Sequence, residues 1–272
     1  METHLQTLAR GQAALGHRVE VLCMQHRTGP TETEQDGPVT VTRFRPVVAA
    51  KKLEVSLALL AALRRNRADI LHVQVPNPTM LLAVALARPE APLVVTYQSD
   101  VVRQWVLAAL FRPIERWVYR KVRKVLSTSA PYAEKSPFLR RYRDRVHVVP
   151  LGVDLEPYLR PTPEDRQTSE GLKARYPGPI WLACGRLTYY KGLHNAMRAL
   201  PQVPGTLLVV GDGPERPALE AEARRNGAFS RVVFVGELPT LRRIVPYYHA
   251  ATALWFPSNY KSEAFGLVQV EA

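Results

Sequence analysis

Two cationic residues stand close together where a strand-like run gives way to a helix-like one. In CGRLTYYKGL (184–193), Gly185 and Arg186 follow an apolar run, and Lys191 stands at the start of the next helical pattern. A glycine lets a ligand approach the backbone, and cations near a helix start can neutralise phosphate oxygens. The stretch predicts a diphosphate site, although helix starts are also common places for surface Lys and Arg.

A second charged set lies in the stretch SEAFGLVQVEA. Glu263 and Glu271 flank an apolar run, and Gly266 marks the expected start of a helix. The free N–H groups of a helix start can hold phosphate oxygens, and a carboxylate can accept two hydrogen bonds from a vicinal diol. A nucleotide-sugar offers a ribose diol, a diphosphate and sugar hydroxyls in that order. Ordinary surface carboxylates would explain the pair equally well.

A glycine turn in VVGDGPE (209–215) follows another strand-like run. Gly211 would suit a tight turn at the carboxyl end of a strand, where α/β sheets bind ligands. A purely structural turn accounts for this motif just as well.

Strand-like and helix-like segments alternate through most of the chain, which predicts an α/β fold with parallel strands and crossover helices. The stretch 150–179 is rich in Pro, Gly and charge and is expected to be a linker, after which the alternation restarts. Two doubly wound halves, 1–155 and 156–272, are therefore expected to face each other across a ligand-binding cleft. The expected strands are Val19–Met24, Val39–Phe44, Ile70–Val75, Leu93–Tyr97, Val125–Thr128, Val146–Val149, Ile180–Cys184, Thr206–Val210, Val232–Val235 and Ala253–Phe256.

Composition predicts a globular protein, because 46% of the 272 residues are hydrophobic. Disorder is expected only around Thr28 to Pro38. Cys23 and Cys184 lie in apolar runs and are expected to pack in cores, as in a reducing cytosol. There is no metal-ligand spacing and no apolar stretch of membrane-spanning length.

The positive charge is concentrated in the first half. Residues 1–150 hold 23 Lys and Arg against 12 Asp and Glu, a net charge of +11, while 151–272 hold 14 against 12, a net of +2. The densest part runs from Arg112 to Arg145. It indicates an anionic partner such as a phospholipid surface, a polyphosphate substrate or nucleic acid, or simply a solvated helix face.

Both ends of the sequence are expected to be cut. Met1 leads directly into an amphipathic helical pattern with no strand before it, and the last residues stop inside a helical pattern. Each half is therefore expected to be incomplete.

The motifs GRLTYYKGL, GDGPE, VVFVGELP and FPSNYKSEAFGLVQVEA, in this order, resemble the donor-binding half of the family 4 glycosyltransferases. The segments DILHVQVPNP, LVVTYQSDVVRQ and VVPLGVD are similar to the acceptor-side half of the same family. The resemblance implies the GT-B fold of two Rossmann-like domains and a retaining hexosyltransferase that uses a nucleotide-diphosphate sugar, GDP-mannose or a UDP-sugar.

The resemblance also implies residue roles. Arg186 and Lys191 would neutralise the leaving diphosphate without a metal or other cofactor. Glu263, with the backbone of Ala264, Phe265 and Gly266, would hold the transferred sugar and its phosphate, and Glu271 would bind the ribose. The donor site would be completed by Gly185, Gly211, Val235 and Gly236, the last two beside the base.

Three departures from the family pattern bear on activity. Gln98 stands where relatives usually have a histidine near the reacting centre, and Gln74 replaces another common histidine beside His72, which is expected to be a packed residue. A glutamine can hydrogen-bond but cannot carry a positive charge. The third departure is the absent Gly-Gly loop ahead of Glu2.

The expected function is transfer of a hexose to a saccharide or lipid-linked acceptor in polysaccharide or glycolipid biosynthesis. The enzyme would be cytoplasmic and peripheral at the inner face of a membrane, with Arg112–Arg145 against anionic lipid and no nucleic-acid partner. The alternative is an inactive remnant that at most binds nucleotide-sugar.

Overall fold

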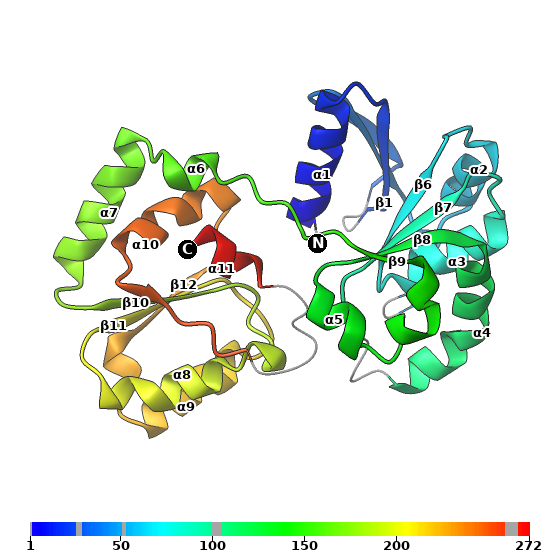
Figure 1. The fold of residues 1–272 in the computed structure, drawn as a ribbon. Helices are drawn as coiled ribbons and strands as arrows, with labels where there is room; N and C mark the ends of the chain where they lie inside the picture. Colours follow the sequence, from blue (N-terminus) through cyan, green and yellow to red (C-terminus); the bar gives the residue numbers. More distant parts are fainter. Residues whose placement is uncertain (1, 26–28, 51–52, 100–104, 259–265) are drawn as a thin grey trace. The chain divides into compact units, whose positions relative to one another are not determined.

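The structure is a computed structural model that describes residues 2–25, 29–50, 53–99, 105–258 and 266–272. It divides into two compact units, Met1–Gly152 and Val153–Ala272. Each unit is described below by itself (Figure 1). The sequence places the domain boundary after residue 155, and the division between the units falls after residue 152.

The first unit contains a four-stranded parallel sheet in the order β6-β7-β8-β9. Its buried strand residues pack with helices into one core that includes Val75, Val95, Tyr97 and Tyr119. This confirms the expected parallel arrangement for this part of the chain. The strands are β6 (Leu71–Val75), β7 (Leu93–Tyr97), β8 (Val122–Ser127) and β9 (Val146–Val148), and the helices are α2 (Leu57–Arg65), α3 (Pro78–Ala87), α4 (Trp105–Lys121), α5 (Ala130–Lys135) and η1 (Leu139–Arg145).

A separate three-stranded sheet, β1-β3-β2, precedes it. Strands β1 (Val19–Met24) and β3 (Val39–Phe44) are parallel, and helix α1 (Glu2–Ala14) packs against both of them. A short antiparallel pair, β4 (Val48–Ala50) and β5 (Leu53–Val55), was not expected from the sequence.

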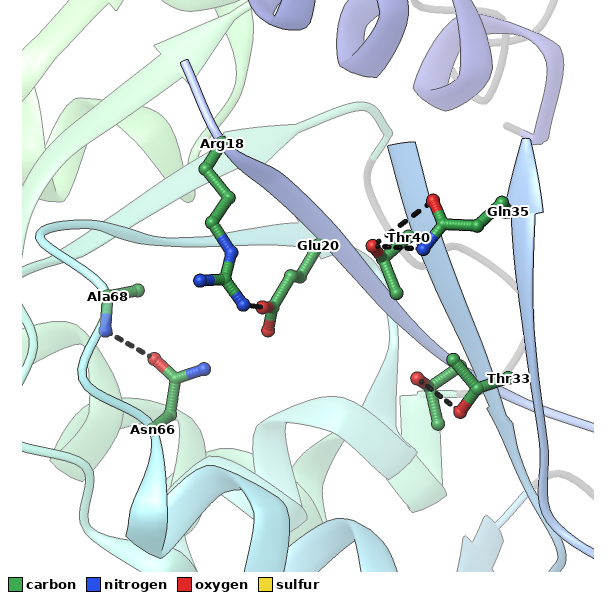
Figure 2. Close-up of polar contacts among 8 residues, drawn as sticks. Arg18, Glu20, Thr33, Gln35, Thr40, Asn66 and Ala68 are labelled. Carbon is green, nitrogen blue, oxygen red and sulfur yellow. Dashed lines mark hydrogen bonds and ion pairs between the residues drawn. The ribbon is translucent and has the colours of Figure 1, made fainter. Parts of the chain in front are cut away.

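Strand β2 (Glu32–Asp36) corrects the expectation of disorder around 28–38, since it pairs antiparallel with β3. Its sequence ETEQD lacks the apolar residues that mark a strand, because the strand is largely exposed. Cross-strand polar pairs support it instead: the Thr33 and Thr42 hydroxyl oxygens are 3.1 Å apart, and the Gln35 amide donates to the Thr40 hydroxyl at 3.0 Å (Figure 2).

The second unit is built on a parallel sheet in the order β12-β11-β10-β13. Alternate residues of β11 enter two cores: Leu207 and Val209 pack with α8 and α9, while Leu208 and Val210 face the residues of α7 and α10 on the other side (Figure 1). A sheet covered on both faces is the doubly wound arrangement that the sequence predicts. The strands are β10 (Ile180–Cys184), β11 (Thr206–Val210), β12 (Val232–Gly236) and β13 (Ala253–Leu254).

The α-helices of this unit are α6 (Glu156–Leu159), α7 (Pro163–Arg175), α8 (Leu193–Ala199), α9 (Arg216–Arg225), α10 (Val245–Ala250) and α11 (Leu267–Glu271). The 3-10 helices are η2 (Tyr189–Lys191), η3 (Leu200–Gln202), η4 (Phe229–Arg231) and η5 (Leu241–Ile244).

Helix α7 shows that the prediction of a linker over 150–179 is wrong. Thr162 and Asp165 form a reciprocal capping box at its start, and Pro163 occupies the first helical turn. Asp165 also pairs with Arg242 at 3.2 Å. Most of the α7 surface is polar, and for this reason the Pro and charged residues of the stretch were interpreted as a linker. The helix nevertheless packs on one face of the sheet.

Among the residues that the structure describes, no helix combines the length and the apolar character needed to cross a membrane.

Candidate functional site

Three glycines bring the carboxyl ends of β10, β11 and β12 together. The Gly185 N–H donates to the Val210 carbonyl at 3.0 Å, and the Gly211 N–H donates to the Gly236 carbonyl at 2.7 Å. Gly185, Gly211 and Gly236 have φ values of +123°, +124° and +86°, which favour glycine. A Cβ on Gly211 would lie 2.2 Å from the Gly185 carbonyl oxygen, so the close packing of these strand ends requires glycine there.

The Lys191 side chain lies against Gly185, at the carboxyl end of β10. Its Cε and Nζ are 3.5 and 3.6 Å from the place where a Cβ of Gly185 would stand. The ammonium also lies 5.5 Å from the centroid of the Phe256 ring and 5.9 Å from that of Tyr190. These cation–π contacts hold the charge above the strand end. Arg186 follows Gly185 and is exposed.

The segment 256–257 packs between the Lys191 turn and the start of α11. Gly192 caps α8 with φ +64°, and a Cβ there would lie 2.3 Å from the Pro257 carbonyl oxygen. A Cβ on Gly266 would lie 2.5 Å from Cζ of the Phe256 ring. One aromatic ring therefore contacts both the cation and the N-cap of the helix that carries Glu271. Glu263, Ala264 and Phe265 lie outside the described residues, and their roles stay predictions.

The Glu271 carboxylate accepts a hydrogen bond from Tyr248, a residue that the sequence did not single out. The Tyr248 hydroxyl donates to Glu271 Oε2 at 2.8 Å, and Cys184 Sγ lies 3.0 Å from the same phenol oxygen. Burial raises the pKa of the Cys184 thiol to about 11. Burial also raises the pKa of Tyr248 far above its usual range, with further contributions from Cys184 and Glu271. Both groups therefore stay protonated at neutral pH.

The two cysteines only partly match the expected core positions. Cys23 and Cys184 are half-buried cysteines outside any disulfide, and each packs against the edge of an apolar cluster. Cys184 stands at the carboxyl end of β10, where the sheet opens toward the site, which explains its contact with Tyr248.

The GDGPE loop is both structural and adjacent to the site. The Leu187 N–H donates to the Asp212 carbonyl at 2.9 Å, and a Cβ on Gly213 would lie 2.4 Å from the Leu187 carbonyl oxygen. Arg216 donates to Asp212 and lies 5.5 Å from the centroid of the Phe234 ring. The loop thus holds Leu187, which follows the end of β10, in place. It also brings Arg216 beside β12, the strand that contains the half-buried Val235 and Gly236.

In the first unit, Gln98 belongs to a chain of neutral polar groups at the ends of β6 and β7. The Gln98 side-chain amide donates to Gln74 Oε1 at 2.8 Å. The Gln74 amide nitrogen is 3.3 Å from His72 Nε2, and the Thr96 hydroxyl is 2.7 Å from the same ring nitrogen. Because an amide N–H can only donate, His72 Nε2 accepts. His72 is therefore a packed, hydrogen-bonded residue, as the sequence predicts.

Burial keeps two histidines of this unit neutral. The pKa of His72 is lowered by burial and by the nearby His4. The pKa of His4, which is 7% exposed, is also lowered by burial, against a hydrogen bond to the Gly152 backbone. No group in the chain from Gln98 to His72 carries a charge at neutral pH.

The basic segment 112–145 has two kinds of cation. Arg112, Arg116, Arg120 and Lys121 are exposed along α4. Arg145 instead donates to the carbonyl oxygens of Tyr119 and Val122 at 3.1 and 2.9 Å, which ties β8 to η1. In the described part of the chain, His, Cys, Asp and Glu side chains do not gather in any group that could hold a metal ion.

Two α/β units with parallel sheets, one of which carries glycines and a cation at its strand ends, define a protein of the doubly wound α/β class. Residues 1–157 match the family model described as Glycosyltransferase Family 4, and residues 166–272 match the model Glycosyl transferases group 1. The chain belongs to glycosyltransferase family 4.

Two curated bacterial relatives are similar over long stretches. D-rhamnosyltransferase WbpZ of Pseudomonas aeruginosa is 33% identical over 204 residues, which are 75% of this chain and 52% of that protein. O-antigen chain mannosyltransferase C of Escherichia coli is 28% identical over 278 residues, covering 100% of this chain and 72% of the relative. The match thus spans about half the length of the first relative.

Solved structures show the same fold at low identity. Anabaena HepE in complex with UDP and glucose has a TM-score of 0.67 at 20% identity, covering 93% of this chain and 78% of that one. WaaG, a glycosyltransferase of lipopolysaccharide biosynthesis, has a TM-score of 0.61 at 18% identity, covering 98% and 73%. The predicted GT-B fold is confirmed.

Proposed function

We propose that this protein transfers a hexose from a nucleotide-diphosphate sugar to a saccharide or lipid-linked acceptor during assembly of a bacterial polysaccharide such as an O-antigen. The observation that carries the proposal is the position of Lys191, whose ammonium lies over Gly185 at the meeting point of three strand ends. Relatives named for rhamnosyl and mannosyl transfer support it, as does a structural neighbour in complex with UDP and glucose.

In the proposed reaction, the donor diphosphate lies against Gly185 with Arg186 and Lys191 over its oxygens. The bond between the sugar C1 and the diphosphate oxygen breaks as the acceptor hydroxyl oxygen bonds to C1 on the same face. The hydroxyl proton passes to the departing diphosphate oxygen, so the configuration at C1 is retained. The two cations stabilise the negative charge that develops on the leaving group, a role filled by a metal ion in other enzymes.

Gln98 would contact the transferred sugar by hydrogen bonding alone. Its amide is held by Gln74, and the chain behind it ends in neutral His72. A neutral amide can orient a sugar hydroxyl, but it cannot supply a proton or a positive charge. Catalysis would then depend on positioning and on the cations of the second unit.

The alternative function is nucleotide-sugar binding without transfer. The uncharged chain from Gln98 to His72 favours it, because the groups of this chain supply no charge at neutral pH. A transfer assay with radiolabelled GDP-mannose or UDP-glucose and a saccharide acceptor separates the two functions.

The test of the donor site is calorimetric titration of the full chain with UDP and with GDP. We expect one of them to bind, and Arg186→Ala to weaken that binding at least tenfold, since a charge-assisted contact is worth about 1.5–3 kcal/mol. Arg224→Ala is the matched control, because Arg224 lies in the last turn of α9, away from the strand ends. Failure of both nucleotides to bind, or equal loss of affinity in the two variants, would reject the proposed site.

We also propose that the exposed cations of α4 hold the enzyme against an anionic membrane. Each surface Lys or Arg contributes about 1 kcal/mol near anionic lipid. Vesicles containing anionic lipid should retain the protein at low salt, and Arg116→Glu with Arg120→Glu should release it. Equal retention by neutral vesicles would contradict the proposal.

A further inference from the structure

We propose that Tyr248 is a positioning residue that orients Glu271 and so sets the preference of the donor site for a ribose over a deoxyribose. The proposal rests on the donor site proposed above and adds to it a residue that the sequence motifs do not mark.

Three elements meet at one phenol oxygen. Tyr248 comes from α10, Glu271 from α11 and Cys184 from the end of β10. The phenol oxygen is 2.8 Å from Glu271 Oε2 and 3.0 Å from Cys184 Sγ. The Val268 carbonyl oxygen is a more distant acceptor at 3.5 Å. The shortest contact joins the phenol to the carboxylate.

The hydrogen bonds of this cluster have one direction. A carboxylate only accepts, and Tyr248 has a single hydroxyl hydrogen, which goes to Glu271 because a charge-assisted bond is the stronger one. The Cys184 thiol can then only donate to the phenol oxygen. The order is thiol to phenol to carboxylate, and it uses Oε2 of Glu271.

The Tyr158 side chain also hydrogen-bonds Glu271. Because the two oxygens of a carboxylate offer about four acceptor positions, Glu271 keeps acceptor positions for a ligand beside both phenols. Helix α11 has only five residues, so the helix by itself holds the carboxylate weakly, and the tie to Tyr248 fixes its plane. The Tyr158 ring packs edge-on against Tyr248 with centroids 5.5 Å apart, which limits rotation of the phenol. A fixed carboxylate oxygen suits the hydroxyls of a ribose, each of which donates one hydrogen bond.

The decisive measurement is a ratio of affinities. The full chain is titrated with UDP or GDP, whichever binds, and with its 2′-deoxy and 3′-deoxy forms. We expect the wild type to prefer the ribonucleotide over at least one deoxy form by about tenfold or more, as for a hydrogen bond to a charged group. In Tyr248→Phe the ratio should fall at least threefold, because the ribonucleotide loses affinity and the deoxy form does not.

Tyr247→Phe is the matched control. It removes the same hydroxyl from the adjacent half-buried residue of α10, and its ratio should equal that of the wild type. A merely structural role for Tyr248 would weaken both nucleotides equally and leave the ratio unchanged, which would overturn the proposal. In a Glu271→Ala background, Tyr248→Phe should have no further effect on the ratio.

A second variant covers the case in which Tyr248→Phe does not fold. Cys184→Ala removes only the donor to the phenol oxygen and should lower the ratio in the same direction by a smaller factor. An unchanged affinity ratio in Cys184→Ala would reject the proposed order of hydrogen bonds from thiol to phenol to carboxylate. If the wild type binds a nucleotide through Arg186 but Tyr248→Phe keeps the full ratio, the positioning role fails while the donor site stands. If the wild type binds neither nucleotide, both proposals fail.

Discussion

At the scale of single residues, the site combines positions that the sequence marks with positions that it does not. Gly185 and Gly211 were predicted from their place after apolar runs and Lys191 from its place at the start of a helical pattern, and the structure brings the three together. Tyr248 and Phe256 lie in the segment 245–256, and the sequence analysis assigned neither of them a role. Their contacts depend on which helix follows which strand, and spacing alone does not carry that information.

The amide of Gln98 gives a prediction at this scale. Gln98→Ala should lower kcat for sugar transfer at least tenfold, in line with the loss of one oriented hydrogen bond near the reacting atoms. The Kd of the nucleotide should change less than twofold, because the cations that bind it belong to the second unit. Transfer rates and calorimetry check both values.

Gln35→Ala removes an exposed amide from β2 and serves as the control for Gln98→Ala. An unchanged kcat in Gln98→Ala would contradict the prediction that Gln98 acts near the reacting atoms.

At the scale of elements, apolar strands were predicted well and polar elements were not. Every expected strand of the second unit is present, because buried parallel strands are continuous apolar runs. The strand β2 and the helix α7 were missed, since one is exposed and the other covers the sheet with a few residues of a mostly polar surface. The separation of the first unit into two sheets also depends on pairing that composition does not specify.

The glycine contact between β10 and β11 gives a prediction at this scale. Gly211→Ala should destabilise the protein by about 2–4 kcal/mol, because the new Cβ would meet the Gly185 carbonyl oxygen and the backbone has φ +124°. Urea unfolding measures the loss.

Gly227→Ala is the matched control for the strain. Its φ is +69°, but a Cβ there would meet nothing within 4 Å, so only about 1–2 kcal/mol should be lost. Equal losses in the two variants would mean that the close approach of the strand ends costs nothing.

At the scale of the whole molecule, the positive charge is concentrated in the first 150 residues, which also contain two histidines with lowered pKa values. The net charge of +11 in the first 150 residues was evident from the sequence, but the burial of His4 and His72 was not, since a lone histidine gives no sign of its surroundings. The lowered pKa values of both imidazoles make the stability of the protein depend on pH.

We expect the free energy of unfolding to be greatest above about pH 6.5, the usual pKa of an unfolded histidine. It should fall as the pH drops below this value, because the unfolded chain binds protons that the buried imidazoles do not. Thermal unfolding at pH 7.5 and pH 5.5 shows the difference. His72→Asn should flatten the dependence.

The ring of Phe256 has an evolutionary consequence. The Phe256 ring fills the space where a side chain at Gly266 would stand, and it also contacts the ammonium of Lys191. A substitution at any one of these three positions therefore limits the residues that the other two can accept. A lineage that places an alanine at 266 must first accept a smaller residue at 256, and the cation then loses the Phe256 ring and keeps its contact with Tyr190. The three positions should therefore covary among homologues.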